Sequence, residues 1–151
     1  MALPSSIELQ IVTPDRLIVR EPVDEVEIPG SQGYFGVLPG HTPMLASLAV
    51  GEMWYRKGTE RTYLSLAFGF AEVLPDRVTI LAQIAERAED IDPARAEEAK
   101  KRAETRLLQP KDVDYERARA ALQKALTRLQ VSGRLQLSGR VGRQRMPPPQ
   151  G

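Results

Sequence analysis

Ile91-Asp92-Pro93-Ala94-Arg95-Ala96 is the stretch of sequence at which the chain changes character. On its N-terminal side, short apolar runs are interrupted by Gly and Pro, which is typical of a protein built from β-strands. On its C-terminal side, two Ala-rich and charge-rich helical patterns are separated by Pro110. The sequence therefore predicts a β-rich domain followed by two helices.

The β-rich part runs from residue 6 to about residue 84. Apolar and polar residues alternate in it, as they do in half-buried strands, and the breaks fall at pairs such as Pro29-Gly30 and Pro75-Asp76. Many short strands at this spacing favour an antiparallel sandwich or a flattened barrel. The apolar run from Leu64 to Leu74 is expected to lie between sheets, with Gly69 at a bulge or a close approach of two backbones.

The helical part has recognisable helix starts. Asp92 is expected to cap the first helix, with Pro93 at its first position, and Asp112 or Asp114 is expected to open the second. Each helix carries an apolar stripe, and the two stripes predict an antiparallel hairpin. The stripes are Ala96, Ala99, Ala103 and Leu107, and Ala118, Leu122, Ala125 and Leu129. Because a seam of Ala buries little area, we expect a hairpin that can leave its docking site; permanent packing on the sandwich is the alternative.

Composition excludes several classes of protein. With 42% apolar and 27% charged residues in 151, the chain can bury a core. It has no Cys, which excludes disulfides and thiolate chemistry, and its one histidine, His41, cannot build a multi-His metal site. No run reaches the roughly 20 apolar residues of a membrane helix, and the N-terminus does not look like a secretion signal or a transit peptide.

Charge is distributed unevenly along the chain. Residues 1–85 hold 6 Lys and Arg against 10 Asp and Glu, whereas residues 86–151 hold 15 against 10. From Arg117 onward there are 8 basic residues and no acidic residue. This end is expected to seek an acidic surface, a phosphate or an anionic membrane; a solvated tail is the alternative.

No catalytic motif accompanies these patterns. The chain has no phosphate-binding loop, no nucleophile turn and no metalloprotease motif, so we expect that it is not an enzyme by itself. The Gly-rich loop from Gly30 to Gly36 carries Tyr34 and Phe35, which favours a protein interface unless one ring points into the core. Arg95, Arg102 and Arg106 share one helix side near Asp92, which suits a nucleotide, although such faces are usually only solvated.

Three motifs, in this order and spacing, resemble the ε subunit of bacterial F-type ATP synthase from about Ile7 to Val131. They are Gly36-Val37-Leu38-Pro39-Gly40-His41-Thr42-Pro43-Met44-Leu45, Ala88-Glu89-Asp90-Ile91-Asp92-Pro93-Ala94-Arg95-Ala96 and Asp112-Val113-Asp114-Tyr115-Glu116-Arg117-Ala118. The resemblance implies a β-sandwich of about ten strands and a regulatory two-helix hairpin. We accordingly divide the chain into a sandwich (1–85), a hairpin (86–131) and a flexible basic tail (132–151).

The resemblance also implies a function and partners. The chain would be a non-catalytic rotor subunit of the central stalk that couples proton flow to ATP synthesis, peripheral on the cytoplasmic face of the bacterial plasma membrane. The sandwich would bind the γ subunit and the ring of c subunits. The hairpin would extend into the catalytic head of α and β subunits and inhibit ATP hydrolysis, with no cofactor required and no nucleic acid bound.

Site residues follow from the same resemblance. An ATP site in the hairpin, with ATP as a regulatory ligand, would consist of Glu86, Ile91, Asp92, Arg95, Ala96, Arg102, Lys124 and Arg128. Lys124 departs from the Arg of good binders, and a Lys offers no bidentate fork. Inhibitory contacts with β would come from Arg117, Arg119, Lys124 and Arg128. Contacts with γ or the c ring would come from Ser31, Gln32, Tyr34 and His41.

Two departures and two rival functions stay open at this point. Leu66-Ala67-Phe68-Gly69 stands where many members of the resembled family have a smaller, Gly-richer turn. The tail after Val131 is longer than is usual in that family. One rival is a stand-alone nucleotide-sensing module, which would bind ATP but no γ subunit. The other is a nucleic-acid-binding protein, which is disfavoured because Trp54 and all Tyr residues lie outside the basic run.

Overall fold

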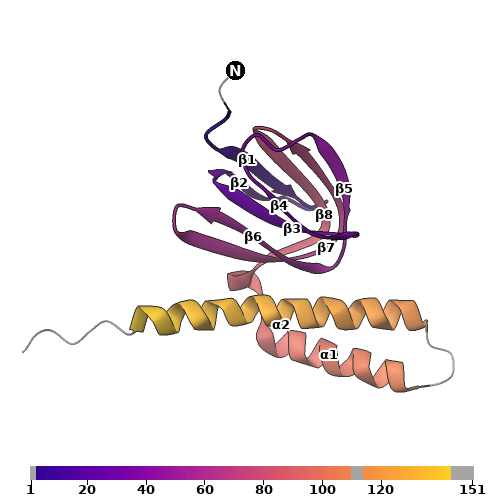
Figure 1. The fold of residues 1–151 in the computed structure, drawn as a ribbon. Helices are drawn as coiled ribbons and strands as arrows, with labels where there is room; N and C mark the ends of the chain where they lie inside the picture. The colour runs from indigo at the N-terminus through magenta and orange to yellow at the C-terminus, as the bar shows by residue number, and fades with distance from the viewer. Residues whose placement is uncertain (1–2, 110–113, 144–151) are drawn as a thin grey trace, which may run out of the picture.

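The computed structural model describes residues 3–109 and 114–143. Eight strands and a short 3-10 helix precede two α-helices (Figure 1). The elements are β1 (Ile7–Val12), β2 (Leu17–Val23), β3 (Glu25–Gly30), β4 (Gly33–Val37), β5 (Met44–Leu48), β6 (Gly51–Lys57), β7 (Glu60–Leu74), β8 (Arg77–Arg87), η1 (Ala88–Asp90), α1 (Pro93–Leu108) and α2 (Tyr115–Arg143). The predicted order of a β-sandwich followed by a helical hairpin is confirmed.

The strands form one continuous hydrogen-bonded sheet that folds over on itself. The order is β2-β1-β8-β7-β5-β3-β4, and β6 pairs with both β3 and β7. Seven of the eight pairings are antiparallel, whereas β1 and β8 run parallel. The strands number eight rather than about ten, because β7 and β8 are long enough, at 15 and 11 residues, to pass through both layers.

The core follows the predicted alternation. Ile7, Leu9 and Ile11 of β1 are fully buried, while Glu8 between them is exposed. The run from Leu64 to Leu74 does not lie wholly between layers, however, because Phe70 is 64% exposed on the outward face. A strand with apolar residues on both faces appears in the sequence as a continuous apolar run, which is also the pattern of a fully buried strand.

A kink in β7 explains how one strand serves both layers. Before the kink β7 pairs with β6, and after it with β5. Phe68 and Gly69 at the kink both have positive φ, of 58° and 128°. A Cβ on Gly69 would overlap the carbonyl oxygen of Leu81 in β8, so the predicted close approach of two backbones is confirmed.

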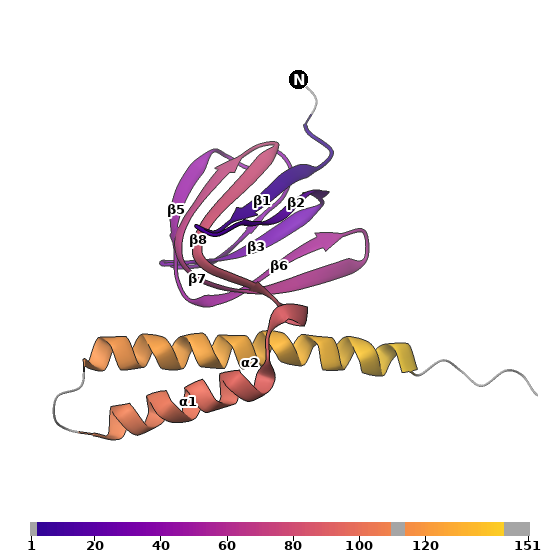
Figure 2. The same cartoon turned by 180° about the vertical axis from the view of Figure 1, so that it is seen from behind.

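Both helices lie at the end of the sandwich remote from the N-terminus (Figures 1 and 2). The chain leaves β8 through η1, runs out along α1 and returns along α2, which passes between α1 and the sandwich. Asp92 caps α1, with Pro93 as its first residue, as predicted. Asp114, one of the two residues expected to open the second helix, stands at the start of α2, where its carboxylate accepts a hydrogen bond from the Arg117 amide at 3.2 Å. The other, Asp112, lies outside the described residues.

The second helix is longer than expected. A flexible tail was predicted from residue 132, but α2 continues to Arg143. Two features account for the longer helix. Val131 and Ser132 are buried against the rest of the molecule, and Arg, Leu and Gln, all good helix formers, follow them in the sequence. The end of the predicted flexible tail, residues 144–151, lies outside the described residues.

Candidate functional site

The hairpin is held together by a narrow seam of small side chains. Ala96 and Ala103 of α1 and Ala118 and Ala125 of α2 are each at most 2% exposed. These are four of the predicted stripe residues, so the seam lies where the sequence placed it. Because an Ala side chain buries little apolar area, the seam contributes little stability per residue.

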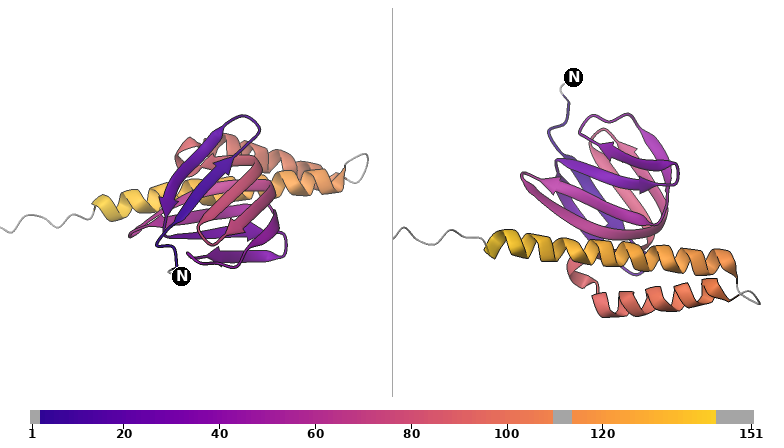
Figure 3. Two further views of the ribbon diagram at one scale, coloured as in Figure 1. Left: turned by 90° about the horizontal axis from the view of Figure 1, so that it is seen from above. Right: turned by 60° about the horizontal axis from the view of Figure 1, so that its bottom comes forward.

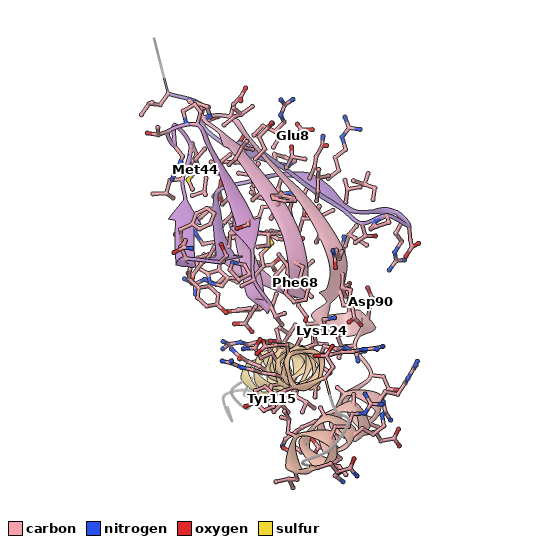
Figure 4. The ribbon with its side chains drawn as sticks, turned by 90° about the vertical axis from the view of Figure 1, so that its right-hand side faces the viewer. Glu8, Met44, Phe68, Asp90, Tyr115 and Lys124 are labelled. Atoms are coloured by element: carbon pink, nitrogen blue, oxygen red, sulfur yellow. The ribbon has the colours of Figure 1, made fainter. Side chains whose placement is uncertain are left out.

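A different face of α2 contacts the sandwich. Figure 4 views α2 end-on and shows Lys124 on the side of the helix that faces Phe68, with α1 on the other side. The Lys124 ammonium lies 5.3 Å from the centre of the Phe68 ring, within the range of a cation–π contact. Val131, seven residues further along α2, is fully buried beside Ala88 and Ile91.

Arg128 ties this face of α2 to the end of β8. Its Nη2 donates a hydrogen bond to Oε2 of Glu86 at 3.1 Å, and its Nε lies 2.9 Å from Oε1. The Nε–H is not aligned for a hydrogen bond, although the atom is buried. Both side chains are about three-quarters buried, so this ion pair is screened less than a surface pair.

A second ion pair lies further along α2. Arg134 donates from Nε to Oε2 of Glu52 at 3.1 Å and from Nη2 to Oε1 at 2.8 Å. Glu52, in β6, is only 8% exposed, and the guanidinium also lies 4.9 Å from the centre of the Tyr63 ring. The hydrogen bonds to Glu52 raise the pKa of the Arg134 guanidinium, while burial acts in the opposite direction. Sequence reasoning missed this pair, because its partners are 82 positions apart.

The predicted ATP residues are only partly brought together. Glu86 and Arg128 are in contact, Ile91 is buried, and Ala96 lies in the helix seam. Asp92 uses its carboxylate to accept from the amides of Ala94 and Arg95, at 3.0 and 3.3 Å. Two members of the predicted set, Arg95 and Arg102, are exposed on α1, while Lys124 faces Phe68.

The predicted inhibitory residues divide into two groups. Arg117 and Arg119 are exposed in the first turns of α2. Lys124 and Arg128 are engaged by the sandwich through Phe68 and Glu86. In the folded hairpin, therefore, half of this basic set is already in contact with another part of the chain.

The four predicted interface residues also fall at separate places. The backbone amide of Ser31 donates to the Ser47 carbonyl at 2.9 Å, and Gln32 is exposed in the same turn between β3 and β4. Tyr34, 58% exposed, accepts a hydrogen bond from the Glu52 amide at 3.3 Å, close to the second ion pair. His41 lies beside the turn between β7 and β8, where the Gly40 amide donates to the Pro75 carbonyl at 2.8 Å.

An outward-facing apolar surface was missed by the sequence reasoning. Phe70 and Leu81 are cross-strand partners on β7 and β8 and are 64% and 54% exposed. Leu45 of the neighbouring β5 is 75% exposed. Three large apolar side chains exposed on adjacent strands are typical of a protein contact surface. The signal in the sequence was ambiguous, since Phe70 lies within the continuous apolar run.

Family models match both parts of the chain. Residues 6–88 match the model described as ATP synthase, Delta/Epsilon chain, beta-sandwich domain. Residues 89–133 match the model of the same family's long alpha-helix domain. The chain belongs to the ATP synthase epsilon chain family. Members of this family are non-catalytic subunits of ATP synthase, so the prediction that the chain is not an enzyme by itself is confirmed.

Individual relatives agree with the family models. The ATP synthase epsilon chain of Nitratidesulfovibrio vulgaris is 53% identical over 129 residues, which cover 85% of this chain and 96% of that one. The epsilon chain of Koribacter versatilis is 58% identical over 102 residues, covering 68% and 72%. A chain of the Euglena gracilis mitochondrial ATP synthase, solved with F1 and the c-ring, has a similar fold, with a TM-score of 0.77, 26% identity and coverage of 87% and 84%.

The two ion pairs differ in whether both partners lie within the residues that match the family models. The Glu86–Arg128 pair joins residues within the matched domains, whereas Arg134 lies just beyond the match, which ends at residue 133. Within residues 3–109 and 114–143, no group of three or more His, Asp or Glu is placed to hold a metal ion. Among the helices of that part, none is long and apolar enough to cross a membrane.

Proposed function

We propose that this chain is a central-stalk subunit of a proton-translocating F-type ATP synthase. It turns with the rotor on the cytoplasmic face of the bacterial plasma membrane and couples proton flow to ATP synthesis by joining the γ subunit to the c ring. Family membership supports the proposal, as does the likeness to a chain of the Euglena enzyme that was solved with F1 and the c-ring. The coupling is mechanical, because torque passes through the contacts of the sandwich.

The observation that carries the proposed docking is the apolar surface formed by Leu45, Phe70 and Leu81. We assign this surface to γ, and the polar turn of Ser31 and Gln32, with Tyr34, to the c ring. A charged residue at Phe70 would be buried without a partner on docking, which costs several kcal/mol. Because Phe70 is 64% exposed in the free chain, the same change should leave the sandwich folded.

The test is the affinity of the full chain for purified γ subunit. F70E is expected to weaken binding at least tenfold, because residues near the centre of an interface carry most of the binding free energy. L17E is the matched control, since Leu17 is 51% exposed on β2, at the far edge of the sheet. Equal affinity of both variants would refute the assignment of this surface.

The hairpin is proposed to regulate hydrolysis of ATP. In the folded state α2 holds Lys124 and Arg128 against the sandwich, and its seam with α1 contains the small buried side chains of four Ala residues. If the hairpin extends along γ, these two residues are released and join the exposed Arg117 and Arg119 in one basic arm. That arm would meet an acidic segment of a β subunit and block hydrolysis. The balance between states is shifted only by a partner with different affinity for each.

ATP is proposed as a ligand that favours the folded hairpin. Arg95 and Arg102 are exposed on α1 and suited to phosphate oxygens. Arg128 already contacts Glu86, so binding through Arg128 would require it to share or exchange that partner. Because of this competition, and because position 124 is a Lys, we expect a lower affinity for ATP than in a site where two Arg guanidinium groups are available for bidentate contacts to phosphate.

Calorimetry of the full chain with ATP tests this ligand. R102A is expected to weaken binding at least tenfold, because a charge-assisted contact to phosphate is removed. K101A, the neighbouring exposed cation on α1, serves as the matched control. No heat of binding at millimolar ATP, or an equal loss in both variants, would contradict the proposal. Tight ATP binding without γ binding would instead favour the stand-alone nucleotide sensor.

A further inference from the structure

Three residues lie side by side across β6, β7 and β8 beneath α2. Glu52 pairs in register with Ser65, and Ser65 pairs with Glu86. Partners in register point to the same face of a sheet, and here that face is turned towards α2. Ser65 is only 4% exposed although it lies on an outward face, so α2 covers it.

The spacing of the two acids matches the spacing of two arginines on α2. Glu52 and Glu86 are separated by two strand spacings, about 9.6 Å. Arg128 and Arg134 are separated by six residues of helix, a rise of about 9 Å. The helix passes obliquely beneath the sandwich (Figure 3), from Phe68 to Tyr63 along β7 and from Glu86 in β8 to Glu52 in β6. Each arginine therefore lies over one glutamate, and the two pairs fix both the position and the direction of α2.

We propose that the Glu52–Arg134 pair is a latch that holds the hairpin folded, supplied by the part of α2 that continues beyond the residues matching the family's helical domain. Arg134 follows directly after the matched residues, and the helix runs on to Arg143. The fork of Arg134 makes two hydrogen bonds to Glu52, and its guanidinium lies over Tyr63. The extension thus makes the folded hairpin the resting state without requiring a nucleotide. The inference deepens the proposed regulation and rests on it only in taking the hairpin as the moving part.

Burial of Glu52 under α2 makes the ion pair with Arg134 stabilise the folded hairpin. Access of both charges to water after α2 leaves makes its opening reversible. Glu52 is 8% exposed, so loss of Arg134 would leave a buried carboxylate without its counter-ion, which is strongly unfavourable. When α2 moves away as a whole, however, the outward face of β6 is uncovered and both charges regain water. Arg134 is already 37% exposed and needs little further movement to reach solvent. The latch therefore opposes partial loosening more than complete release.

The test uses the full chain with the single substitution S65C as reporter. The sequence has no Cys, so this thiol is the only one, and it reacts with a soluble maleimide only when α2 has moved away. R134Q and E52Q are expected to speed its modification about tenfold to a hundredfold, because hydrogen bonds to a charged group are lost. The double variant should add little beyond either single variant if the two residues act as a pair.

E8Q is the matched control. Glu8 pairs with Arg20 at 3.5 Å on the exposed side of β1 and β2, and its loss should leave the rate unchanged. Urea unfolding of each variant shows whether the thiol reacts through local opening or through global unfolding. If E52Q does not fold, R134Q decides alone. An unchanged rate in R134Q, or an equal increase in E8Q, overturns the latch.

The same variants separate the latch from the proposed regulation. In the assembled catalytic head, a looser latch should lower ATP hydrolysis, because more hairpins extend. Faster modification of the thiol with unchanged hydrolysis would retain the latch and refute inhibition by the hairpin. Unchanged modification with lowered hydrolysis would refute the latch and leave the proposed regulation intact.

Discussion

Gly69 is the position at which one methyl group should cost the most. Its φ of 128° is a conformation that L residues rarely adopt, and such a backbone costs about 1–3 kcal/mol. An added Cβ would also overlap the Leu81 carbonyl oxygen and lie 2.9 Å from the Ala82 Cα. These are backbone atoms of the paired strand, so β8 must move and hydrogen bonds of about 1 kcal/mol each are weakened. Together G69A should lower the free energy of unfolding by about 3–5 kcal/mol, a large part of the usual total.

Urea unfolding followed by fluorescence measures this loss, because the chain has a single tryptophan, Trp54. G36A is the matched control, since a Cβ at Gly36 meets nothing within 4 Å. We expect its effect to stay within about 0.5 kcal/mol, as for most surface changes. A G69A variant within about 1 kcal/mol of the parent chain would refute the argument that the kink in β7 requires glycine.

Three further outcomes follow from single contacts. At Phe68, whose φ is 58°, F68G should be more stable than F68A by about 1 kcal/mol in urea unfolding, since both lose the ring that faces Lys124 but only glycine relieves the backbone. Burial, followed by a hydrogen bond with Glu21, raises the pKa of Tyr55 above 10.0, so its contribution to stability is complete below that pH and is lost as pH rises through the folded-state value. The stability of the parent chain should therefore fall more steeply above about pH 10 than that of Y55F, and parallel curves would contradict this. D92A should cost about 1 kcal/mol through loss of the α1 cap, seen as lower helicity by circular dichroism; unchanged helicity would show that the cap is dispensable.

Local patterns in the sequence predicted local structure well. Asp92 and Pro93 begin α1 as expected, and the spacing of Ala96, Ala103 and Ala118 identified the seam of the hairpin. These features depend on backbone geometry and on residues three or four positions apart, which a single sequence displays directly.

Contacts between distant segments were not predictable in the same way. The sequence does not indicate that Glu52 contacts Arg134, because the position of α2 relative to β6 depends on how the whole sheet folds. Phe70 was assigned to the interior because a run of apolar residues does not reveal which of them point outward. The continuation of α2 to Arg143 was not predicted either, because it accompanies the docking of Val131 and Arg134 on the sandwich, which the sequence does not display.

The hairpin is proposed to restrain ATP hydrolysis by the catalytic head. This proposal is tested most directly by comparing ATP hydrolysis by the assembled catalytic head with the full chain and with a chain ending at Arg87. Arg87 is the right end because β8 stops there and its side chain donates to the Ile18 carbonyl at 2.7 Å. If the hairpin restrains hydrolysis, the rate should be higher with the shortened chain. Equal rates, with both chains shown to bind γ, would contradict the proposal.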